Sequence, residues 1–184
     1  MTRMLQLAKA TLFPRKRLPG FGALDTSTTV LRVHPGDLDL YRHVNNGSYL
    51  QMMDVARSNL LGDIGGLTRL KERGWYPVVA SSTMTYKRSL QLFEKVTIST
   101  RVLGWDARVV YIEQTFRVGD RHCARGWVAG RFLGKDGSRV APRDVLDLFV
   151  DGVAPESPAL PDDVAAWARA VDVAHRDPDV PAAR

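Results

Sequence analysis

One long helical segment followed closely by four strand-like stretches is the pattern that most constrains the fold of this chain. Apolar residues in the helical segment recur every three or four positions, at Tyr49, Met52, Met53, Ala56 and Leu60. We predict its start at Asn45 or Asn46, because an Asn side chain can accept a hydrogen bond from the first free N–H groups of a helix. Glycines at positions 62, 65 and 66 predict its end.

The strand-like stretches are rich in β-branched and aromatic residues in near alternation, and they cover residues 75–87, 95–104, 108–118 and 122–133. Turns rich in glycine and aspartate separate the later stretches. Such short connections favour antiparallel pairing, and an earlier strand is expected at residues 26–33. The pattern therefore predicts an α+β domain in which an antiparallel sheet packs on one helix.

The segment from Asp37 to Tyr49, just ahead of the helix, concentrates carboxylates, an imidazole and amides. A returning loop would place the Asp39 carboxylate near the free N–H groups beside Asn46. Those groups carry the positive end of the helix dipole and suit a carbonyl oxygen that gains negative charge. Partial burial in a cleft would raise the pKa of the carboxylate and make it a better base. We therefore interpret this segment as a reactive loop.

The same run, Asp39 followed by the sequence His-Val-Asn-Asn at 43–46, resembles the signature of hotdog-fold acyl thioesterases. These include the 4-hydroxybenzoyl-CoA thioesterase-like group and the plant acyl-carrier-protein thioesterases. The resemblance covers about residues 25–145 and implies a hotdog fold, in which a curved antiparallel sheet wraps one long central helix. It also implies hydrolysis of acyl-CoA or acyl-carrier-protein thioesters without a cofactor. A homodimer or dimer of dimers, with active sites between subunits, is implied as well.

The resemblance gives catalytic roles to Asp39, His43 and Asn46. Asp39 would act as general base or nucleophile, His43 would orient the loop or assist proton transfer, and N–H groups near Asn46 would hold the oxyanion. The alternatives are a structural Asx turn for Asp39 and a structural hydrogen bond for His43. Asp37 is expected to order the loop. Substrate contacts are expected from Tyr41, Asn45, Tyr49, Lys87 and Arg88.

This chain departs from the family pattern at Tyr41 and Arg42. The plant enzymes carry Asn at the place of Tyr41, and the bacterial aromatic-CoA enzymes carry a small residue followed by Gly. Three consequences stay open: the Tyr41 ring narrows the site, contributes its hydroxyl, or weakens turnover.

Two other functions stay open from the sequence. A non-catalytic protein that binds acyl thioesters or lipids would keep the fold without the chemistry. A hotdog hydratase or dehydratase would need an acid–base pair reaching the acyl chain, and Glu113 and His122 are distant candidates for one.

Metal chemistry is not expected. His34, Asp37, Asp39 and His43 lie within ten residues of one another, but they do not have a known ligand spacing. Cys123 is the single cysteine, which excludes an intramolecular disulfide. We expect it to be a small buried hydrophobe, and the resemblance to acyl-carrier-protein thioesterases leaves a Cys nucleophile as the alternative.

The formal net charge is +6, and arginines spread along the chain account for most of it. A nucleic-acid binder would be expected to gather such charge with aromatic residues on one surface, and no nucleic-acid motif is present. A basic rim for the phosphates of coenzyme A or the acidic surface of a carrier protein fits equally well. Candidates for this rim are Lys87, Arg88, Arg125 and Arg131.

The expected organisation is a basic arm at residues 1–24, a thioesterase-like domain at 25–150, and a Pro-rich linker, short helix and tail at 151–184. The apolar runs of the arm are too short to span a bilayer, and it fits a signal peptide poorly, so we expect a cytoplasmic protein. The arm is either a helix in peripheral contact with a membrane or a mobile or dimer-packing arm. Helices are also predicted at 142–150 and 162–175, with a loose tail at 178–184.

Overall fold

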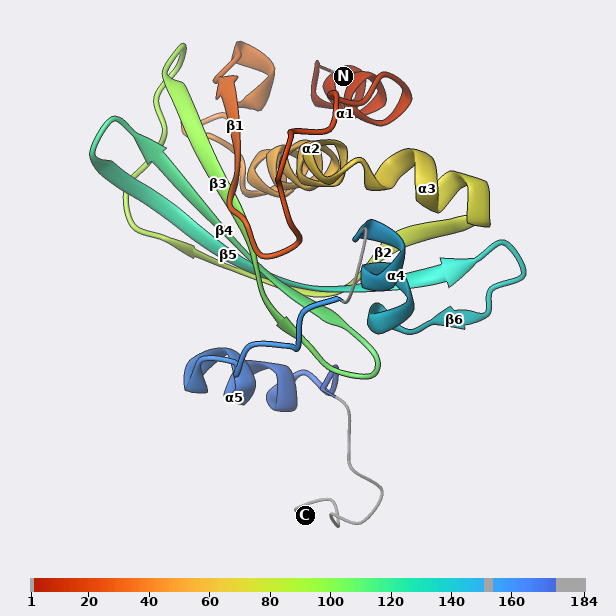
Figure 1. Ribbon diagram of the computed structural model, residues 1–184. Helices are drawn as coiled ribbons and strands as arrows, with labels where there is room; N and C mark the ends of the chain where they lie inside the picture. The colour runs from red at the N-terminus through yellow and green to blue at the C-terminus, as the bar shows by residue number, and fades with distance from the viewer. Residues whose placement is uncertain (1, 151–153, 175–184) are drawn as a thin grey trace.

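The structure, a computed structural model, describes residues 2–150 and 154–174. One antiparallel sheet curls around the central helix α2 (Asn46–Ile64), as Figure 1 shows. The strand order is β1-β3-β4-β5-β2, and β6 pairs with β5. The strands are β1 (Ser27–Arg32), β2 (Trp75–Tyr86), β3 (Lys95–Trp105), β4 (Val110–Val118), β5 (Arg121–Gly134) and β6 (Arg139–Val140). The predicted α+β arrangement of a curved sheet around one long helix is confirmed.

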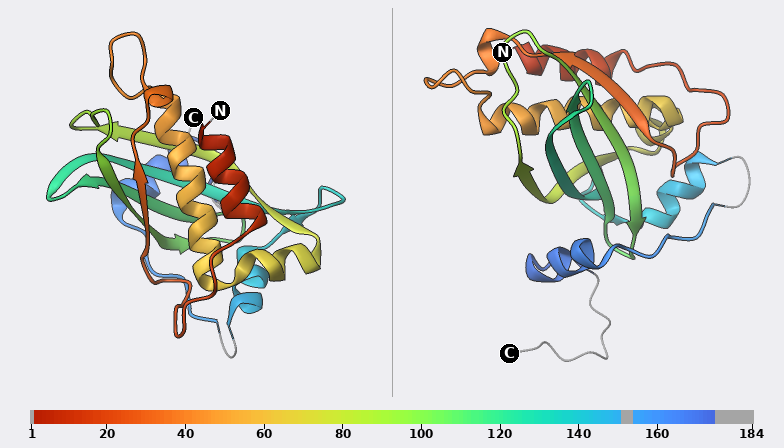
Figure 2. Two further views of the ribbon diagram at one scale, coloured as in Figure 1. Left: turned by 90° about the horizontal axis from the view of Figure 1, so that it is seen from above. Right: turned by 90° about the vertical axis from the view of Figure 1, so that its left-hand side faces the viewer.

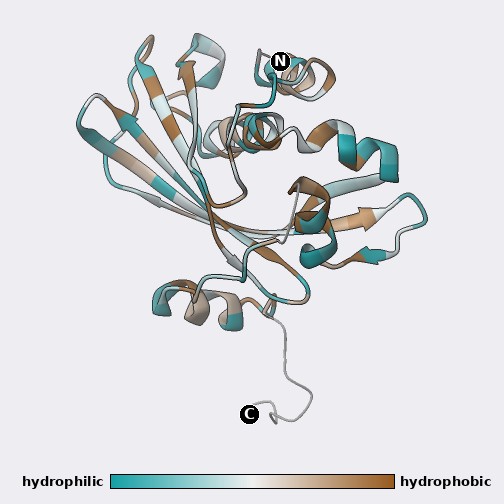
Figure 3. Cartoon of the chain, viewed as in Figure 1, coloured by the Kyte–Doolittle hydropathy of each residue, from teal (hydrophilic) through white to brown (hydrophobic). Residues whose placement is uncertain are grey.

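Hydrophobic and hydrophilic residues alternate along the strands, as the colours in Figure 3 show. The inner face of the sheet packs on the first half of α2 through a core of buried apolar side chains, among them Met52, Met53, Ile98, Phe116, Ala124 and Val128. Because successive side chains of a strand point to opposite faces, the same strands leave a second apolar face on the outside of the sheet.

α2 begins and ends where the sequence predicts. The Asn45 side chain accepts a hydrogen bond from the Gly47 N–H at 2.8 Å, which resolves the choice between Asn45 and Asn46 as the cap. Gly65 ends the helix in the left-handed conformation, with φ of 76°. A second helix, α3 (Gly66–Arg73), follows at once and was not predicted, because paired glycines indicate a stop and not a change of direction.

The first residues of the basic arm form a folded helix, α1 (Thr2–Leu12), which lies alongside α2 in both views of Figure 2. α1 buries a charged side chain and exposes apolar ones, which is the reverse of the usual arrangement. Arg3 is buried on the side that faces the rest of the protein, whereas four apolar side chains stay 70–77% exposed: Met4, Leu5, Leu12 and Phe13. No helix within the described residues is long and apolar enough to cross a bilayer.

Two helices follow the sheet. α4 (Pro142–Phe149), predicted at 142–150, lies on the inner side near α3, where Phe149 packs over Gly66. α5 (Asp162–Ala170) lies on the opposite side of the sheet in Figure 1 and covers its outer apolar face. The prediction that this helix continues to residue 175 is wrong for residues 171–174, because Asp172 takes a left-handed φ of 57°, and residue 175 lies outside the described residues. The tail predicted at 178–184 lies outside the described residues.

Candidate active site

The predicted reactive loop is a short hairpin that leads into α2. Leu38 and Val44 form an isolated antiparallel bridge, and the Asp39 N–H donates to the His43 carbonyl oxygen at 2.8 Å. At the base of the hairpin, the Asn45 N–H donates to the Asp37 carbonyl oxygen at 2.8 Å. The loop is therefore an ordered unit whose last residue is the cap of α2.

The tip of this hairpin projects into solvent. Leu40 is 99% exposed and Tyr41 is 83% exposed. Arg42 has φ of 61°, in the left-handed region that glycine adopts most readily. The bacterial pattern has Gly at this place, so the loop keeps a backbone shape that glycine would favour.

The Asp39 side chain is half-buried and accepts two hydrogen bonds from its own loop. Its Oδ1 atom accepts from the Tyr41 N–H at 2.9 Å and from the His43 N–H at 3.1 Å. This is the Asx turn that was the structural alternative for Asp39. Both bonds use Oδ1, so the turn orients the carboxylate without occupying its second oxygen with a loop N–H.

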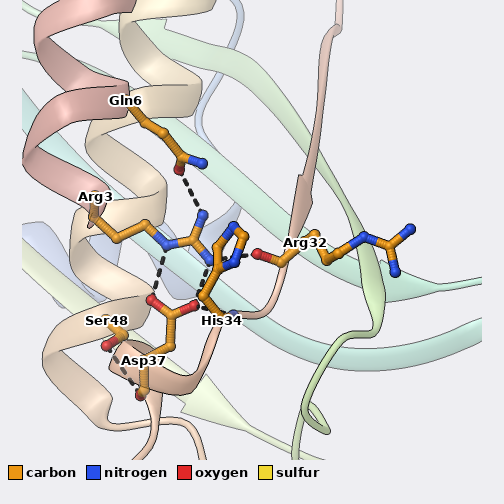
Figure 4. A network of polar contacts seen from close by, with 6 residues as sticks. All are labelled: Arg3, Gln6, Arg32, His34, Asp37 and Ser48. Carbon is orange, nitrogen blue, oxygen red and sulfur yellow. Dashed lines mark hydrogen bonds and ion pairs between the residues drawn. The ribbon is translucent and has the colours of Figure 1, made fainter.

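Asp37 holds the base of the hairpin from inside the protein (Figure 4). Its carboxylate accepts from the Arg3 guanidinium and from the His34 N–H, and its carbonyl oxygen accepts from the Ser48 hydroxyl at 3.1 Å. With 2% exposure it is buried. These contacts match the loop-ordering role predicted for Asp37, and they bring in Arg3 of α1, which sequence reasoning placed in the arm.

The remaining predicted site residues gather only partly around the loop. His43, Asn45 and Asn46 are exposed on it, as are Lys87 and Arg88 just after β2. The Tyr49 ring is buried against Tyr86 and Phe116, and its hydroxyl accepts from the Leu90 N–H at 3.3 Å. Burial raises the pKa of the Tyr49 hydroxyl. Tyr49 therefore connects the first turn of α2 to the end of β2.

An apolar hollow lies elsewhere along α2. A cavity of about 250 Å³ separates the second half of α2 from the sheet and from α4. Its lining begins on α2 at Asp54, eight positions after Asn46, which is about 12 Å along a helix. Asp39, His43 and Asn46 do not line this cavity. Within one protomer, the reactive loop and the hollow are therefore separate.

Sequence reasoning missed the polar side of this cavity. Asp54 and Arg57, three residues apart on α2, form an ion pair there, and Arg57 Nη1 donates to Gln114 Oε1 at 2.7 Å. Gln114 is fully buried and donates in turn to the Met53 carbonyl and to Thr100 Oγ1. Burial raises the pKa of the Asp54 carboxyl against the opposing effect of Arg57, and burial lowers the pKa of Arg57. The acid–base pair three positions apart was the available signal.

The other candidates do not join the loop. Arg125 lies over the Trp127 ring at 4.8 Å and near Asp163 of α5, on the outer face of the sheet. Glu113 lies opposite Trp127 on β5 and binds Arg101, whereas His122 pairs with Arg117 further along the ladder. The hydratase pair is therefore not brought together.

The described residues hold no group of three or more His, Cys, Asp or Glu side chains arranged for a metal ion. Cys123 is fully buried, as a small hydrophobe would be. Arg131, another candidate for a basic rim, contributes to the lining of the cavity and not to the loop.

Comparison with known proteins assigns this fold and loop to a class. The model of the thioesterase-like superfamily matches residues 33–168, and the chain belongs to that family. Solved structures with the same fold include the YbaW probable thioesterase from Escherichia coli, with a TM-score of 0.61 and 21% identity, covering 68% of this chain and 99% of that one. A mutant of 4-hydroxybenzoyl CoA thioesterase complexed with 4-hydroxybenzoyl CoA also has a TM-score of 0.61, with 19% identity over 68% of this chain and 99% of that one. The predicted hotdog fold is confirmed.

Among curated relatives, Protein THEM6 of Drosophila melanogaster is 33% identical over 106 residues, which cover 57% of this chain and 53% of that protein. Protein THEM6 of Danio rerio is 30% identical over 139 residues, which cover 75% of this chain and 66% of that protein. The alignment with this chain thus spans between about half and two thirds of the length of these relatives.

Proposed function

We propose that the protein hydrolyses acyl thioesters, with Asp39 as general base or nucleophile. The observation that carries this proposal is the connection of Asp39 through one short hairpin to the cap of α2. In the reaction, the oxygen of water or of Asp39 adds to the thioester carbonyl carbon, and the oxyanion receives hydrogen bonds from N–H groups at the start of α2. The C–S bond then breaks, and the thiolate leaves and takes up a proton. When Asp39 attacks directly, water hydrolyses the resulting anhydride.

We also propose that the active form is a homodimer joined through β2. β2 is the end strand of the sheet and runs for 12 residues, of which Tyr76, Val79 and Tyr86 keep large exposed apolar side chains. A long open edge of this kind invites pairing with another strand. Pairing with a second copy would be antiparallel about a two-fold axis. Light scattering on the purified protein tests this, and a monomer at micromolar concentration would contradict it.

This pairing would join two parts that one protomer keeps apart. The first half of β2 lines the cavity at Pro77–Val79, and the end of β2 at Tyr86 contacts Tyr49 under the reactive loop. Antiparallel pairing over the whole strand would lay the end of one β2 beside the start of the other. The loop of one subunit would then lie near the cavity of its partner. This supports a site shared between subunits, with Lys87 and Arg88 as a basic rim for coenzyme A or a carrier protein.

Thiol release from acyl-CoAs and acyl-carrier-protein thioesters tests the proposed reaction. Asp39→Asn is expected to lower kcat by at least about 100-fold with the fold intact, because the Asn oxygen can still accept the two loop hydrogen bonds. Asp136→Asn is the matched control, since Asp136 Oδ1 accepts from the Ser138 N–H in another exposed turn. Absence of thiol release in the wild type, with acyl-CoA still bound, would favour the non-catalytic binding protein instead.

The exposed apolar side of α1 supports a peripheral contact with an anionic membrane. Met4, Leu5 and Leu12 of α1 and Phe13, which follows α1 directly, are exposed, and Lys9 and Lys16 are exposed nearby. Sedimentation with vesicles that contain phosphatidylserine tests this proposal. The double variant Leu12→Glu/Phe13→Glu should bind these vesicles less than the wild type does. Equal binding by the wild type and the double variant would contradict the proposed membrane contact. The predicted cytoplasmic location stays a prediction.

A further inference from the structure

Two glycines of β5 mark where the space between the sheet and α2 changes from filled to hollow. A Cβ atom at Gly126 would lie 2.5 Å from Met84 Sδ and 2.7 Å from Met53 Cε. A Cβ atom at Gly130 would meet only two carbonyl oxygens, at 3.8 and 4.0 Å. Both positions are on the inner face of the strand, because residues an even number apart share a face. The interior is therefore packed beside the first half of α2 and open beside the second half.

The open part is the cavity of about 250 Å³, and most of its wall is aliphatic. Leu60, Leu61 and Ile64 of α2 face Val78, Ile112 and Val128 of the sheet across it. Pro142, Val145, Leu146 and Phe149 of α4 close one side. A hollow lined in this way offers water few hydrogen-bond partners, so it favours an apolar occupant.

Three of the polar residues that line the cavity, Asp54, Arg57 and Ser58, lie within five positions of one another on α2. Asp54 is 41% exposed and Val79, on the edge strand, is 49% exposed, and both line the cavity. The cavity therefore reaches solvent between α2 and β2. A ligand with an apolar tail and a polar head can insert the tail and leave the head beside the Asp54–Arg57 pair and Ser58.

We infer that this cavity holds the hydrocarbon chain of an aliphatic acyl group, an assignment that rests on the proposed hydrolysis of acyl thioesters. The mouth lies at the edge where β2 pairing would bring the partner's reactive loop, so the carbonyl end of the chain would face that loop. An aromatic acyl group with a ring hydroxyl fits less well, because most side chains of the wall are apolar and offer that hydroxyl no hydrogen bond.

The dependence of activity on the length of the acyl chain tests this assignment directly. Each added methylene that is buried should raise kcat/KM about fourfold, and the rise should stop once the chain fills the cavity. Gly130→Leu should move this plateau to shorter chains, because its side chain would occupy the hollow without a backbone clash. Leu61→Ala enlarges the cavity and should move the plateau to longer chains. Ser99→Leu, which adds a side chain to the outer face of β3, is the control and should leave the profile unchanged.

The experiment measures thiol release by the full chain with saturated acyl-CoAs from two to sixteen carbons and with 4-hydroxybenzoyl-CoA. A flat profile, a preference for the aromatic substrate, or a Gly130→Leu profile equal to that of the wild type would overturn the assignment. If no acyl-CoA is cleaved, the proposed reaction fails by itself, and displacement of a fluorescent fatty acid then tests the cavity. The assignment of the cavity is supported if Gly130→Leu no longer binds the fatty acid and Ser99→Leu still does. Equal binding by the two variants would overturn the assignment.

Discussion

Arg3 and Asp37 form a buried, two-pronged ion pair that ties α1 to the base of the reactive hairpin. Arg3 Nε donates to Asp37 Oδ1 at 2.9 Å and Arg3 Nη2 donates to Asp37 Oδ2 at 2.6 Å, with each side chain 2% exposed. Arg3 Nη2 also donates to the Arg32 carbonyl oxygen and Arg3 Nη1 donates to Gln6 Oε1, so four of the five guanidinium N–H groups are hydrogen-bonded (Figure 4). A buried charge is tolerated when it is paired and hydrogen-bonded in this way.

Removing one partner of this pair should therefore be costly. Arg3→Met leaves the Asp37 carboxylate buried without its counter-charge and is expected to lower the free energy of unfolding by about 3–5 kcal/mol. The double variant with Asp37→Asn should lose less than the sum of the single losses. Urea unfolding of the four proteins measures both effects, and additive losses would show that the pair does not couple. Hydrogen exchange of the Asp39 and Asn45 amides should also quicken in Arg3→Met, because the hairpin base is loosened.

The helix cap offers a matched pair of amides. Asn45→Ala removes the acceptor of the Gly47 N–H and should cost about 1 kcal/mol of stability. Asn46→Ala removes a neighbouring amide that is not the cap and should cost clearly less. Thermal or urea unfolding of the two variants compares them. Equal losses would contradict the cap assignment.

Packing at the two inner glycines of β5 predicts opposite outcomes for one substitution. Gly126→Ala places a methyl group against Met84 and Met53 and should destabilise the fold by about 1–3 kcal/mol. Gly130→Ala meets no close atom and removes the flexibility of a glycine in a strand, so stability should stay equal or rise slightly. The urea midpoints of the two variants measure this difference. If Gly130→Ala lost as much stability as Gly126→Ala, the result would count against an open cavity beside Gly130.

A shared active site predicts that two inactive subunits can complement each other. Asp39→Asn lacks the base, and Gly130→Leu lacks space for a long acyl chain. In an equimolar mixture that exchanges subunits, half of the dimers are mixed and each of these holds one intact site. Long-chain activity should then recover to about a quarter of the wild-type value. If the loop and the cavity of one subunit worked together, mixing would restore nothing.

Stability should fall at alkaline pH because buried tyrosines resist ionisation. Burial raises the pKa of Tyr49, and burial together with a hydrogen bond to Asp106 raises the pKa of Tyr111, both from an ordinary value of 10.0. Above pH 10 the unfolded chain therefore binds fewer protons than the folded one, and the free energy of unfolding decreases as pH rises. Tyr111→Phe should make this decrease shallower. Chemical unfolding at pH 8 to 11 measures the slopes, and identical slopes would refute the role of Tyr111.

Local chemistry explains why much of the fold was predictable. The alternation in β2 to β5, the Asn45 cap and the Gly65 stop are each decided by neighbouring residues, so they can be recognised without a tertiary structure. α3 was missed because Gly65 ends one helix and serves as the start of the next, and β6 has only two residues. α5 ends at Ala170 because Asp172 takes a left-handed φ, and without a glycine there the sequence carries no signal for this stop.

The candidate site also has parts that the sequence predicts and parts that only the tertiary structure shows. The sequence determined the hairpin ahead of α2, because turn residues and a helix cap follow one another within 13 positions from Asp37 to Tyr49. Only the tertiary structure decided that Arg3 reaches Asp37 across 34 positions, that Asp54 and Arg57 form one side of a cavity, and that this cavity opens beside Gly130. The physical reason is that hydrogen bonds within a turn depend on nearby residues, whereas buried ion pairs and hollows depend on how distant segments fill space.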